Sequence, residues 1–258
     1  MTRVLITGSA QGLGRTAAAQ LLADGHQVVV HARNPERAAT LRDLADRGAS
    51  VVVGDLSSQV ETRDVGDQVN QLGRMDAVIH NAGVYGDIPR EPTSDGHPRL
   101  LAVNTLAPYL LTGLIQTPDR LVYLTSDMHV GGDHSLHDLD WNDRTWDGTQ
   151  AYCDSKLFVT ALALAIARRR PDVSSHAVDP GWVPTRMGGP SASGDLEQGH
   201  LTQTWLAVSD DPSAGRSGQV WHHRRPTTTA AAAHSSDFQD RLLDRLADLT
   251  GYVLPLPT

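Results

Sequence analysis

The sequence predicts a doubly wound α/β fold, in which about seven parallel strands are covered by helices on both faces of the sheet. Three observations predict it. Short apolar runs alternate with helical patterns, the order from residue 3 onward is strand, helix, strand, helix, strand, and a glycine-rich turn joins the first strand to the first helix. Apolar runs without polar alternation indicate strands that are buried on both faces.

The expected strands are the short apolar runs bounded by turn residues. They are Val4–Thr7, Val28–His31, Ser50–Val53, Asp76–His80, Arg120–Thr125, Ser174–Asp179 and Ser217–Trp221. Because each is followed by a helical pattern, crossover connections and a parallel sheet are expected.

The expected helices show apolar residues at helical spacing, with Gly25 ending the first and Pro35 near the start of the second. They are Gly14–Ala23, Arg37–Arg47, Val60–Leu72, Leu100–Leu114, Ala151–Arg170, Leu196–Ala207 and Asp237–Leu249. The Ala230–Ala233 run is expected to be a loop or the edge of a helix.

Composition bounds the class of protein. The 258 residues carry 22 basic and 30 acidic side chains, a net charge of −8, with 40% apolar residues. One domain over residues 1–258 is expected, without a nucleic-acid surface. The single cysteine, Cys153, excludes an intramolecular disulfide. With no long apolar span and no signal-peptide pattern, the expected location is cytoplasmic and away from membranes.

A glycine-rich turn, Thr7-Gly8-Ser9-Ala10-Gln11-Gly12-Leu13-Gly14, follows the first strand and opens the first helix. Glycines at such a point allow a tight turn and a close approach of the backbone to a pyrophosphate, as in Rossmann dinucleotide sites. The helix N-terminus then presents N–H groups to the anion. A purely structural turn is the alternative interpretation.

Tyr152 and Lys156 lie four residues apart at the start of a predicted helix, so their side chains share one face. Lys156 is the only lysine beside 21 arginines, and arginine does not supply a compact ammonium with a tunable pKa. A nearby ammonium favours the phenolate, so the pKa of Tyr152 is expected to fall toward working pH. The tyrosine would then exchange a proton with a hydroxyl or carbonyl oxygen.

Ser126 follows the fifth strand, and ligands of doubly wound folds bind at the carboxyl ends of the strands. Its hydroxyl is therefore expected to face the cleft and to stabilise charge on a substrate oxygen. Asn104, within the helix predicted over Leu100–Leu114, is the remaining polar candidate.

These motifs together resemble the short-chain dehydrogenase/reductase family, over nearly the whole chain. The spacing Gly-x-x-x-Gly-x-Gly and the set Asn104, Ser126, Tyr152 and Lys156 are similar to those of the family. The length of the segment before Tyr152, together with Tyr-Cys-x-Ser-Lys and Asp138-Leu139, is similar to that of the retinol-dehydrogenase-like branch, without its membrane anchor. In the family's Asn-Asn-Ala-Gly segment, His80 replaces the first asparagine. The resemblance implies that Asn104 holds a water beside Lys156 through its backbone carbonyl, and that Lys156 also binds the nicotinamide ribose.

The resemblance also implies a set of cofactor contacts, including an adenine contact from Asp55. The expected residues are Gly8, Ser9, Gln11, Gly12, Leu13, Gly14, Asp55, Leu56, Asn81, Ala82, Gly83, Tyr152, Lys156, Pro180, Gly181, Val183 and Thr185.

The end of the second strand bears on the choice of cofactor. Ala32 stands where an NAD site usually has an acidic residue, and Arg33 follows it. A guanidinium suits a 2′-phosphate, so NADP is expected rather than NAD, with help from Arg15.

Two loops are expected to shape the substrate pocket: the insert 127–150 and a Gly/Ser/Pro-rich lid at 187–199. The insert's histidines fit no standard metal spacing, so no metal is expected. Residues 222–225 are expected to be a solvated or interface segment. The helix after Tyr152 is apolar on more than one face, and family members commonly dimerise through it, so a homodimer or homotetramer is expected.

The expected function is an NADP-dependent oxidoreductase acting on a small-molecule carbonyl or alcohol. A non-enzymatic NADP(H) sensor on the same fold is the alternative.

Overall fold

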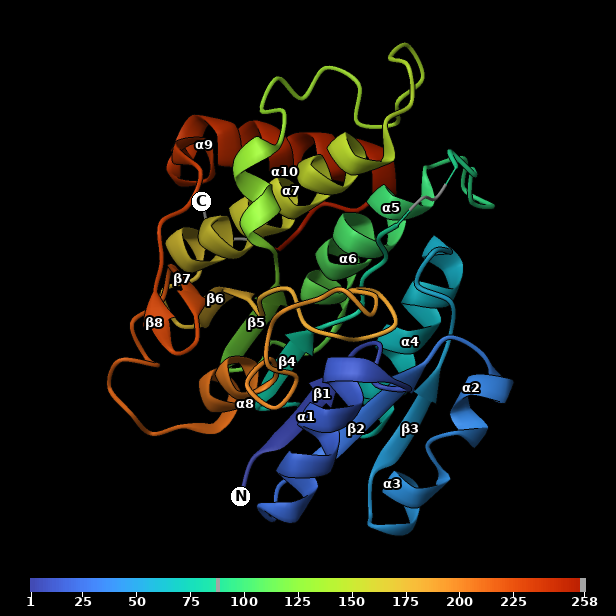
Figure 1. Cartoon of the computed structure of the whole chain (residues 1–258), viewed down its shortest axis with the longest axis vertical. Coiled ribbons are helices and arrows are strands. Elements are labelled where there is room, and N and C mark those ends of the chain that lie inside the picture. The colour runs from blue at the N-terminus through green and yellow to red at the C-terminus, as the bar shows by residue number, and fades with distance from the viewer. Residues whose placement is uncertain (87–88, 256–258) are drawn as a thin grey trace.

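The computed structural model describes residues 1–86 and 89–255 of the chain. In this part of the chain one sheet runs in the order β3-β2-β1-β4-β5-β6-β7-β8 (Figure 1). Its strands are β1 (Arg3–Ile6), β2 (Gln27–Ala32), β3 (Ser50–Val53), β4 (Ala77–His80), β5 (Arg120–Leu124), β6 (Ser174–Asp179), β7 (Gln219–His222) and β8 (Arg225–Pro226). The first seven pair in parallel and β8 pairs antiparallel with β7, so the doubly wound α/β prediction is confirmed with one further short strand.

Alternate residues of each strand enter separate apolar clusters. Leu5 packs into a cluster with the helices α4 (Gln59–Gln71), α6 (Ala107–Leu114), α7 (Gly148–Arg169) and α10 (Ser236–Thr250). Val4 and Ile6 pack into a second cluster with the helices α1 (Gly12–Ala23) and α8 (Leu201–Val208). Because both faces are covered, the strands are apolar at nearly every position, and this is the pattern that the sequence displayed. Figure 1 shows α7 and α10 on one side of the sheet and α1 and α8 on the other.

The helices follow the expected segments with local differences. They are α1 (Gly12–Ala23), α2 (Pro35–Ala39), α3 (Arg42–Asp46), α4 (Gln59–Gln71), α5 (Arg99–Leu101), α6 (Ala107–Leu114), α7 (Gly148–Arg169), α8 (Leu201–Val208), α9 (Ala231–His234) and α10 (Ser236–Thr250), with a π-helical turn η1 (Ala102–Leu106) and a 3₁₀ turn η2 (Asp127–Gly131).

Four expectations about these elements need correction. The helix predicted over Arg37–Arg47 is split, because the chain turns at Thr40 to bury Leu41. The helix predicted from Leu196 begins at Leu201, and α7 begins three residues before the predicted Ala151. The helix predicted over Leu100–Leu114 is divided into α5, η1 and α6. Residues 223–225, expected to be solvated, are exposed and belong to the β7–β8 hairpin, whose turn residues His223 and Arg224 both have positive φ.

The apolar character of α7 is explained within the chain itself. Every residue from Ala151 to Ile166 is buried, and the helix packs against α9, α10, η1, η2, β5 and β6. Contacts within the chain therefore account for the burial of α7 without a partner subunit. The homodimer or homotetramer remains a prediction.

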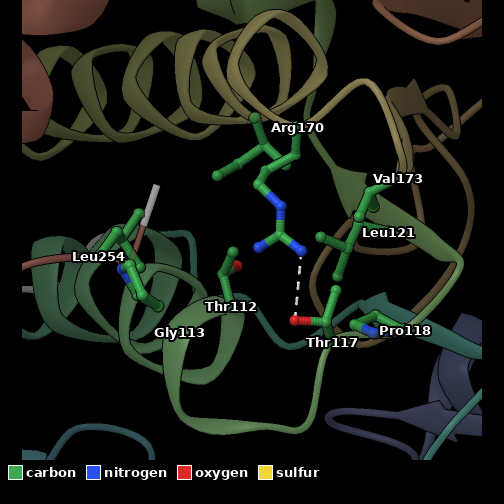
Figure 2. Close-up of a pocket in the computed structure, with 10 residues that line it drawn as sticks. Thr112, Gly113, Thr117, Pro118, Leu121, Arg170, Val173 and Leu254 are labelled. Atoms are coloured by element: carbon green, nitrogen blue, oxygen red, sulfur yellow. Dashed lines mark hydrogen bonds between the residues drawn. The ribbon is translucent and has the colours of Figure 1, made fainter. Parts of the chain in front are cut away.

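Polar candidates collect at the carboxyl ends of the strands. At the opposite edge, a small cavity of about 20 Å³ lies between the end of α6, the end of α7 and the C-terminal segment (Figure 2). Arg170 donates to Thr117 Oγ1 there at 3.3 Å. This cavity is too small for a substrate. No helix in the described residues is both long and apolar enough to cross a membrane.

Candidate active site

Tyr152 and Lys156 lie on one face of the first turns of α7. Asp147 caps this helix by accepting the backbone N–H of Thr149 at 2.9 Å. Nζ of Lys156 is buried and donates to the carbonyl oxygen of Leu124, at the end of β5, at 2.8 Å. It lies 5.5 Å from the centre of the Tyr152 ring. The four-residue spacing and the doubly wound topology therefore bring phenol and ammonium together at the expected edge of the sheet.

Burial dominates the ionisation of Lys156. It lowers the pKa of the ammonium to about 8, and the Asp179 carboxylate opposes this shift. A lysine with such a pKa still carries its proton at neutral pH but is able to release it. This tunable behaviour is what distinguishes a lysine from an arginine at the site.

The pKa of Tyr152 moves in the direction opposite to the sequence expectation. Burial of the phenol raises its pKa, and Asp179 and Asp127 add to the rise. A side-chain hydrogen bond to Ser126 opposes it. The expected lowering by Lys156 is wrong for the net shift, because desolvation outweighs it. At neutral pH the phenol is therefore a proton donor.

Ser126 and Thr125 have different surroundings. Ser126 is the N-cap residue of η2, and its hydroxyl donates to Asp127 Oδ1 at 3.1 Å, at a partly exposed position. The buried hydroxyl of Thr125 instead donates to the carbonyl oxygen of Lys156 at 3.2 Å. Ser126 is therefore the more accessible of the two hydroxyls, and its expected role at a substrate oxygen stays a prediction.

Asn104 lies within the π-helical turn η1 and is buried. Its Oδ1 accepts the N–H of Val84 at 2.8 Å, and its Nδ2 donates to the carbonyl of Val84 at 3.0 Å. A Cβ added to Gly83 would lie 3.5 Å from Asn104 Oδ1 and 3.6 Å from Lys156 Nζ. The asparagine side chain thus fixes the segment after β4 directly beside the lysine. π-Helical turns are frequent at functional sites.

The glycine-rich turn packs against the segment that follows β4. Gly8 has φ +65°, and a Cβ there would approach Cα of Ala82 to 2.8 Å. A Cβ on Gly14 would approach Nδ2 of Asn81 to 2.4 Å, and this amide donates to the carbonyl of Thr7 at 2.9 Å. The glycines are required by these contacts, and the amide of Asn81 joins the two expected cofactor segments.

Two buried polar side chains, those of Ser9 and His31, hold the glycine-rich turn in place through hydrogen bonds. The hydroxyl of Ser9 donates to the carbonyl of Ile6 at 2.8 Å, so its described contact is structural. His31 accepts the N–H of Gly8 on Nδ1 at 3.0 Å and bonds the carbonyl of Gly54 through Nε2 at 2.8 Å. Burial lowers the pKa of His31, which keeps the ring neutral and able to accept. Sequence reasoning did not identify His31, although its place at the end of β2, facing the turn, was a signal.

The segment after β6 closes the other side of this cradle. Gly181 has φ +79° and donates its N–H to Asp179 Oδ1 at 2.9 Å. Val183 is buried. A Cβ on Gly12 would lie 3.6 Å from Cγ2 of Thr185, so the two expected cofactor segments face each other. The two segments that the resemblance assigns to the cofactor therefore lie together, at the edge of the sheet where the glycine pattern predicts a dinucleotide.

The basic residues near the end of β2 have distinct positions. Arg33 is exposed and follows the buried Ala32. Arg15, expected to assist, is held by both carboxylate oxygens of Asp43 at 2.7 Å. Arg37, which the sequence reasoning missed, reaches Gln11 Oε1 on the glycine-rich turn at 3.5 Å. Arg33 and Arg37 are therefore better placed than Arg15 to bind a phosphate.

Asp55 forms a local turn rather than a helix cap. Its Oδ1 accepts the N–H of Ser57 at 2.9 Å and the hydroxyl of the same residue at 2.8 Å. Ser58, not Asp55, caps α4. Leu56 beside it is buried. The expected adenine contact of Asp55 stays a prediction.

Comparisons with known proteins identify the family. Residues 2–118 match the family model described as short chain dehydrogenase. A short-chain dehydrogenase from Gibberella zeae is 39% identical over the full length of both chains, and human retinol dehydrogenase 13 is 28% identical over 98% of this chain and 85% of its own. The chain belongs to the short-chain dehydrogenase family.

Solved structures share the fold of this dehydrogenase. An uncharacterised protein from Mycobacterium Paratuberculosis has a TM-score of 0.86 at 26% identity, over 99% of this chain and 96% of that one. A short-chain dehydrogenase/reductase from Burkholderia multivorans with bound NADP has a TM-score of 0.66 at 22% identity, over 89% and 99% of the two chains. The resemblance is thus confirmed, including similarity to the retinol dehydrogenases. The protein is an NAD(P)-dependent oxidoreductase, and relatives named as dehydrogenases speak against the sensor alternative.

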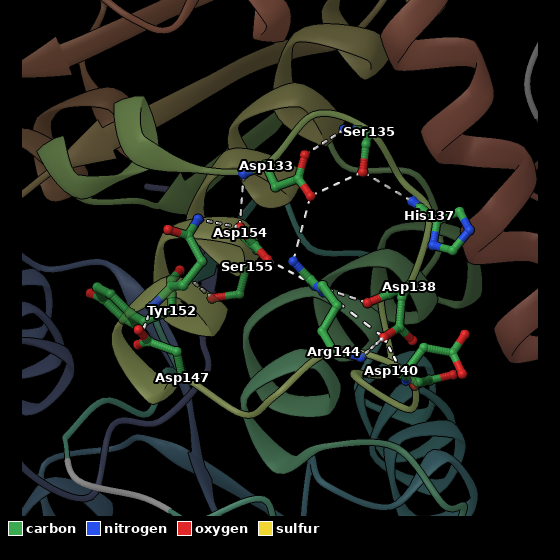
Figure 3. A network of polar contacts seen from close by, with 12 residues as sticks. Asp133, Ser135, His137, Asp138, Asp140, Arg144, Asp147, Tyr152, Asp154 and Ser155 are labelled. Atoms are coloured by element: carbon green, nitrogen blue, oxygen red, sulfur yellow. Dashed lines mark hydrogen bonds and ion pairs between the residues drawn. The ribbon is translucent and has the colours of Figure 1, made fainter.

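The insert of this dehydrogenase, residues 127–147, is fastened to α7 by charge. Nη2 of Arg144 donates to the buried Asp154 at 3.1 Å, two residues after Tyr152 (Figure 3). Asp138 accepts the N–H of Arg144 at 3.0 Å. The guanidinium also lies 3.7 Å from the centre of the Trp141 ring. Charged contacts thus fix the end of the insert next to the catalytic candidates.

An aromatic pocket opens beside Tyr152. The ring of Tyr85 lies 4.3 Å from that of Tyr152, centre to centre, and Trp146 meets Trp141 edge to face at 5.4 Å. The pocket has a volume of about 610 Å³ and is lined by Tyr85, Gly86, Pro89, Trp146, Asp147, Gly148 and Thr149. Such a space holds a ligand of ordinary metabolite size.

The histidines of the insert do not gather into a metal site. His129 is buried, with Nδ1 bonded to the carbonyl of Ser126 at 2.6 Å, while its Nε2 accepts the N–H of Ala230 at 3.3 Å. It therefore positions the backbone of Ser126. In the described residues no group of three or more His, Cys, Asp or Glu side chains is arranged to hold a metal ion.

Proposed function

We propose that the protein reduces the carbonyl group of an apolar small molecule with NADPH, and catalyses the reverse oxidation of the alcohol, with Tyr152 as the general acid and base. One observation carries the proposal. The buried ammonium of Lys156 lies between the phenol of Tyr152 and the segment at Gly83, at the edge where the glycine-rich turn and residues 180–185 converge.

The cofactor would be held by the backbone cradle and by basic residues at its edge. The backbone at Gly12 would approach the pyrophosphate, while Gly8 and Gly14 would keep the turn packed against Ala82 and Asn81. Arg33 and Arg37 would bind the 2′-phosphate, which favours NADP over NAD. Bound NADPH would supply a hydride to the carbonyl carbon of the substrate.

Side chains of the protein would protonate the carbonyl oxygen of the substrate and stabilise the charge that develops on it. The phenol of Tyr152 would donate its proton to the carbonyl oxygen as negative charge develops there. The hydroxyl of Ser126 would donate a hydrogen bond to the same oxygen. Lys156 would stabilise the phenolate that remains, and Asn104 would hold the segment after β4 in place.

The surroundings of Tyr152 support an apolar substrate. Tyr85 and Trp146 line the pocket, and the exposed side chains of Trp182 and Met187 lie on the segment of the chain after β6. Cε of Met187 lies 3.9 Å from a Cβ placed on Gly83, beside Lys156. A planar or aromatic ketone would bury apolar surface against these rings.

Fluorescence titration with NADPH and with NADH tests the cofactor part. We expect tighter binding of NADPH, and a loss of that preference in Arg33→Ala and Arg37→Ala but not in Arg15→Ala, whose guanidinium is already paired. Preference for NADH would contradict the assignment of the two arginines.

Turnover of a panel of ketones tests the catalytic part. In Tyr152→Phe the loss of the proton donor is expected to lower kcat by about 10²–10⁴-fold while NADPH binding stays within a few-fold of the wild type. A Tyr152→Phe protein that binds NADPH and turns over at the wild-type rate would overturn the role of Tyr152.

A further inference from the structure

Asp179 ends β6 one residue beyond the strand position opposite Leu124. In the parallel pairing of β5 and β6, Leu124 is the partner of Val178. The carbonyl of Leu124 is the group to which the ammonium of Lys156 donates. The carboxylate of Asp179 therefore occupies the strand edge next to the lysine, and its side chain is only 12% exposed.

Two contacts fix the direction of this carboxylate. Oδ1 accepts the N–H of Gly181 at 2.9 Å. Oδ2 lies 3.3 Å from Nδ1 of His222, on the neighbouring strand β7. The ring of His222 packs under the Gly181 turn, since a Cβ on that glycine would lie 3.3 Å from its Cε1. The carboxylate is therefore held between the turn and β7.

Other polar and charged groups also surround the Tyr152–Lys156 pair. Tyr85 follows β4, Asp127 lies on η2, and Asp179 and His222 come from β6 and β7. Their effects on the pair differ. Asp179 raises the pKa of Lys156 against the effect of burial, whereas Asp127 acts on the pKa of Tyr152. A buried ammonium whose described hydrogen bond goes to a neutral carbonyl depends on a nearby negative charge to keep its proton.

We propose that Asp179 is a positioning residue of this site: its carboxylate is the counter-charge that keeps Lys156 an ammonium, and its bond to Gly181 fixes the turn that faces the cofactor. The effect on catalysis rests on the proposed function. The pairing of the two charges is a property of the chain itself.

The single lysine makes this pairing directly measurable. In protein labelled with lysine carrying ¹³C at Cε, and expressed with a lysine-free tag, Lys156 gives the only lysine side-chain signal in the NMR spectrum. In Asp179→Asn we expect the pKa of that signal to fall by roughly one pH unit. The amide oxygen of the asparagine still accepts from Gly181, so the variant removes the charge and keeps the turn bond.

Asp127→Asn is the matched control, because it removes a neighbouring carboxylate that acts on Tyr152. We expect the pKa of Lys156 to be unchanged in this variant. Asp179→Ala removes both the charge and the turn bond, so it should weaken NADPH binding several-fold more than Asp179→Asn does. A Lys156 pKa in Asp179→Asn within about 0.2 pH unit of the wild type would overturn the proposal.

Asp179→Glu covers the case in which the uncharged variants fail to fold, because it keeps a carboxylate at this strand edge. We expect the pKa of Lys156 in Asp179→Glu to stay within about 0.2 pH unit of the wild type. A fall of a full pH unit in this variant would overturn the proposal. The lysine titration needs no cofactor, so a wild type that fails to bind NADPH would count against the proposed function and not against the charge pair.

Discussion

The cofactor side and the substrate side of this dehydrogenase are held by different kinds of bonds. On the cofactor side, neutral groups meet the backbone: Gly8 donates to His31, and Asn81 donates to Thr7. On the substrate side, the insert is joined to α7 by charge, as between Arg144 and Asp154 (Figure 3). Neutral backbone contacts demand particular residues at fixed places. Ionic contacts between a loop and a helix allow many pairings, and they leave no motif in the sequence.

The largest effect is expected from a substitution at the closest contact of the cofactor side, that of Gly8 with Ala82. Gly8→Ala should abolish measurable NADPH binding and destabilise the protein by more than the control Gly25→Ala. Both residues have positive φ, which costs about 1–2 kcal/mol for alanine. Only Gly8 would also press against Ala82, whereas nothing lies within 4 Å of a Cβ on Gly25. Thermal unfolding and fluorescence titration measure the two effects, and equal losses in both variants would contradict the close contact.

The next largest effect is expected on the substrate side, from the loss of the ion pair between Arg144 and Asp154. Arg144→Met removes the cation beside the buried Asp154 and is expected to cost about 3 kcal/mol of stability. Turnover should fall while NADPH binding is retained, because the cofactor cradle does not involve the insert. Arg245→Met is the control, since its exposed partner Asp248 contributes little. Urea unfolding together with NADPH titration checks this, and a matching loss of NADPH binding would show that the two sides are not independent.

On the cofactor side, the stability of the fold should depend on pH in the acid range. Burial lowers the pKa of His80 to about 3, so the unfolded chain takes up a proton first and stability falls as the pH drops below 6.5. His80→Phe keeps the stacking on Tyr123 and removes the titration. Between pH 7 and 4.5 the variant should lose roughly 2.7 kcal/mol less stability than the wild type. Urea unfolding at the two pH values tests this, and equal losses would refute it.

On the substrate side, stability should fall as the pH rises, which is the opposite pH dependence and the smallest of the expected effects. The hydrogen bond to Asp140 raises the pKa of His97, so its stabilisation is complete below pH 6.5 and is lost as the pH rises through the folded-state value. His97→Gln should remove roughly 1 kcal/mol of this pH dependence. Thermal unfolding between pH 6 and 9 measures it, and a variant with the wild-type alkaline slope would exclude His97 as its source.

The sequence predicted the sheet well because each of its apolar runs must be buried on both faces. Ser50–Val53 and Ser174–Asp179 agree with the structure residue for residue. The two-residue strand β8 was missed because its turn places His223 and Arg224 at positive φ, which neither residue type signals. The π-helical turn was missed because its surroundings are apolar on all sides and hide the local period.

The candidate site was predictable where chemistry restricts residue type. Tyr152, Lys156 and the glycines lie where the spacing placed them. The engagement of Arg15 by Asp43, and the rise rather than fall of the pKa of Tyr152, depend on neighbours from distant segments and on burial. Neither is encoded in a local pattern, so both required the folded chain.

The π-helical turn around Asn104 has a consequence for insertions and deletions. Such a turn contains one residue more than the α-helical turn it replaces. Deleting a residue within Ala102–Leu106 would let the segment close into a regular α-helix, so the fold should survive better than after a deletion within α7. The damage would be local, because Asn104 would rotate away from Val84. Relatives that differ in length at this turn should therefore differ in how they hold the segment beside the lysine.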